Sequence, residues 1–151
     1  MGADLVYTGA GNDTVWGGSG NATIYAQSGK DTIYAGTGRT IMVAGTAKDV
    51  FVFSPGHTGG LTATTADVIQ HFRAGKGDLV DLSAFDADLP AGVAHLSFIG
   101  TTAFDNHPGE VRYEPLGNGE AVYADINGDG VADMMLVMTK ITSLTAGNFI
   151  L

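Results

Sequence analysis

The chain has 151 residues, of which 44% are hydrophobic, so we expect one domain with a buried core. Its formal net charge of -9 argues against nucleic acid and anionic membranes as partners. The absence of cysteine excludes disulfides and thiolate metal sites, which leaves oxygen-ligated metal as a possible cross-link. No apolar run reaches the roughly 20 residues that span a bilayer, and residues 1–20 lack the features of a signal peptide.

Six nonapeptides follow one another from Met1 to Val52 on the template G-G-x-G-x-D-x-U-x, in which U is apolar. The U position is filled in every unit, by Val6, Val15, Ile24, Ile33, Met42 and Phe51. The D position holds Asp4, Asp13, Ala22, Asp31, Thr40 and Asp49. Glycine permits the positive φ angles of the turns, and we single out Gly9, Gly11, Gly29 and Gly45. Each turn precedes a three-residue strand, so the U residues should stack in one core like the rungs of a solenoid. The first unit begins in mid-repeat, so we expect a piece of a longer protein.

Aromatic residues occupy the last position of the first four units. Tyr7 and Tyr25 should stack on one sheet, and Trp16 and Tyr34 on the other, pointing away from the U column. One interpretation is a platform for sugars or for a preceding domain. The simpler one is cross-strand packing on a half-exposed sheet.

The second half begins with a Gly/Thr-rich loop at 54–66. We expect a short helix from Ser83, and strands at 95–99, 110–113, 121–126 and 134–139, which turn signals separate. This pattern predicts an antiparallel sheet. The core candidates that precede it are Val68, Ile69, Phe72, Leu79, Val80 and Leu82.

The segment from Asp125 to Asp133 has two interpretations. Asp125, Asn127 and Asp129 occupy positions 1, 3 and 5 of an EF-hand-like loop, with Asp133 at position 9. Position 12 is Leu136, so the bidentate acid is missing, and strands flank the loop. A β-turn with solvated carboxylates is therefore favoured over a calcium site.

The nonapeptides resemble the repeats-in-toxin (RTX) family, which implies an all-β fold with a parallel β-roll over 1–53. The resemblance implies that two units form one coil, so that alternate units stack, and that Ca²⁺ binds between stacked turns. One edge then carries Asp13, Asp31 and Asp49, and the other Asp4, Ala22 and Thr40. We expect two or three ions on the complete edge, with Asp67 as a further ligand and Asp4 as a weak one. The alternative is a roll that binds no ion and is held by its apolar column.

Five later segments resemble the C-terminal domain of serralysin-type secreted metalloproteases: DVIQHFRAGKGDLVDLSAF (67–85), FIGTTAF (98–104), GEVRY (109–113), ADINGDGVADM (124–134) and NFIL (148–151). The resemblance implies a cap at 54–151, continuous with the roll, that ends in a type I secretion signal at Asn148, Phe149, Ile150 and Leu151. It implies a secreted, extracellular protein whose partners are the secretion machinery and an upstream domain.

The chain has no H-E-x-x-H zinc motif and no G-x-S-x-G motif, so we expect a non-catalytic module. Any enzyme, such as a metalloprotease, would lie upstream. The alternative function is a surface adhesin or polysaccharide-binding module that uses the exposed aromatic residues. The four histidines share no spacing and should lie on the surface or in loops.

Overall fold

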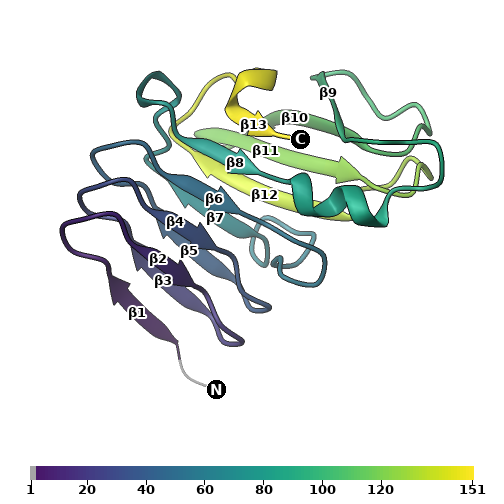
Figure 1. Cartoon of the computed structure of the whole chain (residues 1–151). Helices are drawn as coiled ribbons and strands as arrows, with labels where there is room; N and C mark the ends of the chain where they lie inside the picture. The colour runs from purple at the N-terminus through teal and green to yellow at the C-terminus, as the bar shows by residue number, and fades with distance from the viewer. Residues whose placement is uncertain (1–2) are drawn as a thin grey trace.

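A computed structural model describes residues 3–151 as two β-sheets packed face to face (Figure 1). The larger sheet has eight strands in the order β1-β3-β5-β7-β12-β11-β10-β9, and the smaller has five in the order β13-β8-β6-β4-β2. The strands are β1 (Asp4–Tyr7), β2 (Thr14–Trp16), β3 (Ala22–Tyr25), β4 (Thr32–Tyr34), β5 (Thr40–Val43), β6 (Val50–Val52), β7 (Asp67–Gln70), β8 (Leu79–Asp81), β9 (Ser97–Gly100), β10 (Glu110–Leu116), β11 (Gly119–Asp125), β12 (Met134–Thr139) and β13 (Phe149–Ile150).

The first six strands alternate between the two sheets, so two nonapeptides make one coil of a parallel roll. Asp4 pairs with Ala22 and Thr14 with Thr32, which confirms the predicted stacking of alternate units. The apolar column lies between the sheets. Ile24, Ile33, Met42 and Phe51 are fully buried, whereas Val6 and Val15 of the first coil are only partly buried.

The roll continues through β7 and β8, which add one strand to each sheet. Residues 53–66 of the described chain form no strand, in agreement with the predicted loop. Of the core candidates that follow, Val68, Ile69, Phe72, Val80 and Leu82 are buried, and Leu79 is half-buried because it lies on the outer side of β8.

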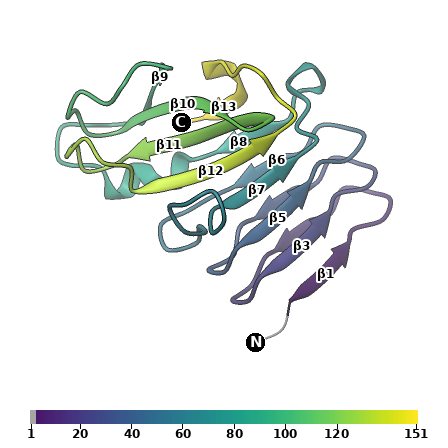
Figure 2. The ribbon, with the colours of Figure 1, turned by 180° about the vertical axis from the view of Figure 1, so that it is seen from behind.

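The expected antiparallel cap is present as β10, β11 and β12, but it is not a separate sheet. Strand β12 runs parallel to β7, with Leu136 opposite Asp67, so the larger sheet passes from roll to cap without a break (Figure 2). Strand β9 is parallel to β10, which the turn signals did not predict. The helical segments are short 3-10 turns: η1 (Ala74–Lys76), η2 (Ser83–Asp88) and η3 (Ala146–Asn148).

The C-terminal strand β13 closes the smaller sheet beside β8, where Phe149 is opposite Val80. Phe149 is buried and its ring lies 5.2 Å from that of Phe98. The last residues are therefore part of the core. Within residues 3–151, no helix has the length and apolar character needed to cross a membrane.

Candidate metal centre

Four aspartates precede the strands of the smaller sheet and form one column along an edge of the roll. The register of β2, β4, β6 and β8 aligns Asp13, Asp31, Asp49 and Asp78. The last three carboxylates each accept the backbone N–H of the aspartate one coil earlier: Asp31 from Asp13 at 2.8 Å, Asp49 from Asp31 at 3.1 Å, and Asp78 from Asp49 at 2.9 Å. The predicted column of Asp13, Asp31 and Asp49 is thus brought together, with Asp78 as its fourth member.

Asp67 does not belong to this column, so its predicted place was wrong. Ile41 pairs with Val68, which puts Asp67 beside Thr40 in the other column. The prediction placed Asp67 two nonapeptides after Asp49, which assumes that every nonapeptide forms a strand. The nonapeptide after β6 forms a loop without a strand, so β7 lies in the larger sheet and not in the smaller one. Asp78 was missed for the same reason, because it stands 29 residues after Asp49.

The second column holds Asp4, Ala22, Thr40 and Asp67. Asp4 is exposed at its outer end, and Ala22 offers no side-chain oxygen. The Thr40 hydroxyl takes the place of a carboxylate by accepting the Gly36 N–H at 3.3 Å. Asp67 is fully buried and accepts the N–H groups of Thr40 and Gly59 at 2.6 and 2.7 Å. Burial raises the pKa of Asp67 to about 6, although these bonds and Arg39 oppose the shift.

The complete column concentrates negative charge in a buried place. Burial, together with the neighbouring Asp78 and Asp31 carboxylates, raises the pKa of Asp49 despite its backbone hydrogen bonds. Burial also raises the pKa of Asp78. Asp13 Oδ2 is buried and has no hydrogen-bond partner among residues 3–151. Like charges stacked in this way favour binding of a cation.

The turns bring backbone oxygens to the same column. A Cβ added to Gly29 would lie 1.7 Å from the Gly11 oxygen, and one added to Gly45 would lie 2.1 Å from the Ala26 oxygen. Gly9, Gly11 and Gly29 have φ angles of 89°, 120° and 117°, so only three of the four singled-out glycines need a positive φ, and Gly45 is needed for close approach. A set of ligands made only of carboxylate and carbonyl oxygens suits Ca²⁺. The Asp13 Oδ2 atom, which has no hydrogen-bond partner among the described residues, is consistent with such a site.

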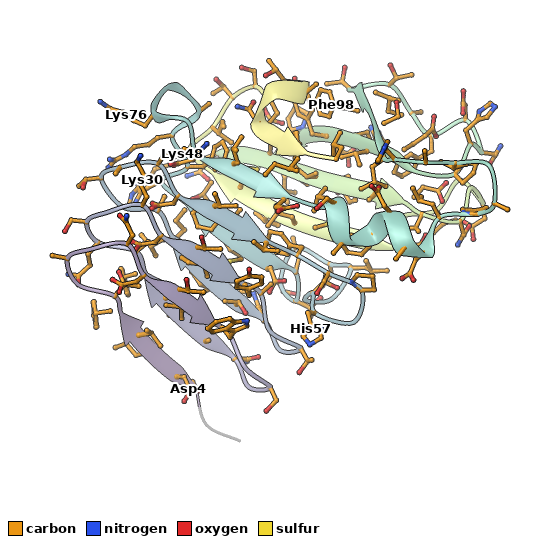
Figure 3. All side chains as sticks on the ribbon, in the orientation of Figure 1. Asp4, Lys30, Lys48, His57, Lys76 and Phe98 are labelled. Carbon is orange, nitrogen blue, oxygen red and sulfur yellow. The ribbon has the colours of Figure 1, made fainter. Side chains whose placement is uncertain are left out.

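Lysines accompany the column on its solvent side. Lys30 and Lys48 directly precede Asp31 and Asp49, and with Lys76 they lie along one edge of the roll (Figure 3). All three are exposed, whereas Asp31 and Asp49 are buried. The cations therefore stand outside the carboxylates rather than among them.

The loop between β11 and β12 holds Asp125, Asn127, Asp129 and Asp133 together. The flanking strands agree with the prediction of a β-turn, but Asp125 is not solvated: it is fully buried. Its two oxygens accept the N–H groups of Gly128 and Gly130, both at 2.7 Å. Asp133 Oδ2 accepts the Ile126 N–H at 2.8 Å. Backbone groups of the loop thus satisfy these carboxylates.

A turn before β10 brings Asp105, His107 and Glu110 together, with one potential ligand atom from each within 4.8 Å of the others. The His107 ring bonds to Asp105, and this contact raises the pKa of His107. Glu110 accepts the Asp105 N–H at 3.0 Å. These two contacts among Asp105, His107 and Glu110 stabilise the turn. All four histidines are exposed, as the sequence predicted.

The aromatic residues form two stacked pairs on the outer faces of the roll. The Tyr7 and Tyr25 rings lie 4.9 Å apart at 10°, and the Trp16 and Tyr34 rings 5.2 Å apart at 8°, which confirms the predicted pairing. Trp16 is 66% exposed. A shallow pocket beside it is lined by Trp16, Tyr34, Ala35, Ser54 and His57.

The four residues of the expected secretion signal are folded rather than free. Asn148 is buried and forms a capping box with Thr145, whose N–H and hydroxyl approach the Asn148 side-chain oxygen at 2.8 and 3.2 Å. Phe149 is buried, Ile150 is exposed and Leu151 is half-buried.

Residues 2–24 and 7–42 match the family of RTX calcium-binding nonapeptide repeats, described as four copies. The matched residues cover β1 to β4 and most of β5 of the roll. No curated protein sequence matches the chain. Two solved structures of the mannuronan C5-epimerase of Azotobacter vinelandii resemble the whole fold. The AlgE6R3 subunit is 19% identical with a TM-score of 0.64, covering 99% of this chain and 80% of that one. The AlgE6R2 subunit is 16% identical with a TM-score of 0.58, covering 97% and 91%.

These neighbours share the architecture of the RTX roll and its strand-rich C-terminal continuation, and so bear out the all-β fold class. Residues 2–42 accordingly carry RTX calcium-binding nonapeptide repeats, and the chain has the fold of a β-roll module. The neighbours are epimerase modules rather than serralysin domains.

Proposed function

We propose that this chain is a non-catalytic module that folds on binding Ca²⁺ outside the cell and supports type I secretion of its parent protein. The observation that carries the proposal is the column of Asp13, Asp31, Asp49 and Asp78, stacked in register with turn carbonyls beside it. The expected number of ions is two or three, on this column and not on the Asp4 column.

The column explains why folding should depend on the ion. Ca²⁺ supplies positive charge that stacked carboxylates lack. The aspartates hold consecutive turns together by accepting each other's backbone N–H groups, but they repel one another when ionised. Where Ca²⁺ is scarce, the roll should be loose. Extracellular modules bind Ca²⁺ with dissociation constants of roughly 10⁻⁴–10⁻³ M, so export would supply the ion that orders the turns.

The position of the C-terminal residues fits the same sequence of events. A secretion channel can read Asn148 to Leu151 only while they are accessible, yet Phe149 is buried in the folded module. Recognition would therefore precede folding. The likeness of residues 67–151 to serralysin-type sequences supports a metalloprotease as the parent, with its active site in an upstream domain.

The test is isothermal titration of the chelator-stripped protein with Ca²⁺, followed by far-ultraviolet circular dichroism. We expect two or three sites, a gain of β signal and some structure already present without the ion. Asp31→Asn should remove heat from the two sites that share this residue, whereas Asp4→Asn, at an exposed end of the other column, should leave the titration unchanged. A fully folded spectrum without any binding heat would contradict the proposal.

A second candidate function is polysaccharide binding. Exposed stacked aromatic rings at Tyr7, Tyr25, Trp16 and Tyr34 are the observation that favours it, since sugars pack on flat aromatic faces. The fold it shares with modules of a mannuronan-modifying enzyme adds to this. Titration with mannuronan should give saturable binding that Trp16→Ala abolishes. Val131→Ala, which changes an equally exposed apolar residue in the β11–β12 loop, should leave it intact.

A further inference from the structure

We propose that the outer edge of the roll, formed by β1 and β2, is a docking surface for one further coil of nonapeptide repeats in the upstream part of the parent protein. This inference shares one assumption with the proposed function, which is that the module belongs to a longer parent protein. It adds which part of that protein makes the contact and through which residues.

Both sheets end at this edge. Strand β1 is the first strand of the larger sheet and pairs only with β3, while β2 is the last of the smaller sheet and pairs only with β4. The two strands lie together at the end of the molecule opposite the cap (Figure 1), and Figure 2 shows β1 at that end from behind. Edge strands are usually protected by proline, lysine or a bulge. Residues 3–29 contain no proline, lysine or arginine.

Apolar side chains are exposed at the same edge. Leu5, Tyr7 and Trp16 are 60%, 58% and 66% exposed, and they are three of the six large apolar side chains exposed among residues 3–151. Val6 and Val15 of the U column are also only partly buried, whereas Ile24 and Ile33, one coil further in, are fully buried. Another coil would cover Val6 and Val15 as this coil covers Ile24 and Ile33.

The aspartate ladder gives the most specific argument. Each later carboxylate of the column accepts an N–H from the preceding coil, and Asp49 also accepts one from Gly45 in its own turn at 2.7 Å. Asp13 is the first aspartate of the column. Among the described residues, its carboxylate accepts no N–H from a preceding coil and none from its own turn. The N–H of Gly9 in its own turn is donated to Gln27 instead, at 3.0 Å. The Asp13 carboxylate is thus in place for a backbone N–H that only a preceding turn would present.

These features identify the occupant as a coil of the same repeat. Its strands must run parallel to β1 and β2, as in every contact between coils, so that its turn lies over Asp13. A second copy of the chain, related by a twofold axis, would reverse the strand direction and move its turns away from Asp13. A nonapeptide coil would repeat the existing register of two units per coil.

The experiment adds a copy of residues 21–38 directly before Ala3, which places the copied Asp31 two nonapeptides ahead of Asp13. In saturating Ca²⁺, where the original roll is ordered, amide hydrogen exchange of the copied strands should be at least about tenfold slower than in a chain that carries the same added segment in shuffled order. Asp13→Ala should cancel much of this protection in the extended chain, while the strands of the cap keep their slow exchange. The result compares two extended chains in the same buffer, whereas the proposed function is tested by the heat of Ca²⁺ binding to the original chain, so either can fail without the other.

Two results would overturn the inference. The first is exchange of the copied strands at the rate of the shuffled segment. The second is concentration-dependent dimerisation of the original chain in sedimentation experiments, abolished by the ordered extension, which would assign the edge to a second copy.

Discussion

Gly11 and Gly29 occupy the same position of the nonapeptide one coil apart, yet their surroundings differ. Their φ angles are nearly equal, 120° and 117°. A Cβ at Gly11 would meet nothing within 4 Å, whereas one at Gly29 would meet the Gly11 oxygen at 1.7 Å and its carbon at 2.4 Å. The second glycine is therefore needed both for its backbone angle and for the contact between coils.

This difference predicts unequal effects of the same substitution. Gly11→Ala should lower the free energy of unfolding by about 1–3 kcal/mol, the cost of a strained backbone angle. Gly29→Ala should cost a further ~1–3 kcal/mol, because two turns must separate to admit the methyl group. Urea unfolding in Ca²⁺ measures both. If both variants lost the same free energy of unfolding, the close contact between the two turns would have no energetic cost and the prediction would be wrong.

At the scale of elements, β13 shows how a two-residue strand can matter to the core. Its Phe149 is opposite Val80 of β8 and contacts the Phe98 ring of β9, so it joins the smaller sheet to the edge of the larger one. Ile150, its neighbour, is 38% exposed on the other side. Stability and secretion can be separated at these two positions.

Phe149→Ala should destabilise the folded module by about 3–5 kcal/mol, the usual cost of removing a buried aromatic side chain. Ile150→Ala should change stability by less than half of that value, as thermal unfolding would show. If a secretion channel reads the apolar triplet, both variants should reduce export of a fused reporter. Normal export of both would remove the triplet from the proposed signal.

For the molecule as a whole, several buried acids make the ion-free state sensitive to pH. Burial raises the pKa of Asp49, Asp67, Asp78 and Glu120 in the folded state. Such groups add stability that is fully present below the unfolded-state pKa of about 4 and is lost as pH rises through the folded pKa. For Asp67 the loss begins near the unfolded-state pKa of about 4 and is nearly complete just above its folded pKa of about 6.

In chelator, the free energy of unfolding should therefore be higher near about pH 5 than near about pH 7.5. Asp67 alone should contribute about 1.4 kcal/mol to this difference, because about one unit of the range over which its pKa is raised lies above pH 5 and each unit is worth about 1.36 kcal/mol. In Ca²⁺ the trend should reverse, because protons and the ion compete for the complete column. Urea unfolding at both pH values, with and without Ca²⁺, measures this.

Asp67→Asn is the control for that experiment. In chelator, this variant should show a smaller decrease of the free energy of unfolding with rising pH. In Ca²⁺ the increase with pH should be unchanged, because Asp67 lies outside the complete column. A stability in chelator that rises from acid to neutral pH would contradict the assignment of these buried acids.

The sequence by itself determined the roll. Its period of nine residues sets the turns, the apolar column and the pairing of Tyr7 with Tyr25 and Trp16 with Tyr34, because each repeated contact involves residues a fixed distance apart. For the same reason Asp13, Asp31 and Asp49 could be aligned without coordinates. In the second half, turn residues and alternating apolar positions located β10, β11 and β12 closely.

Only the tertiary structure decided what lies beyond the period. Because the loop after β6 forms no strand, Asp67 lies in the column of Asp4, Ala22 and Thr40, and Asp78 is the fourth member of the complete column. The local sequence does not determine to which sheet the chain returns after such a loop. The pairing of β12 with β7 and of β13 with β8 joins segments distant in the chain. These pairings depend on which arrangement buries the most apolar surface, and that depends on the whole fold rather than on a spacing.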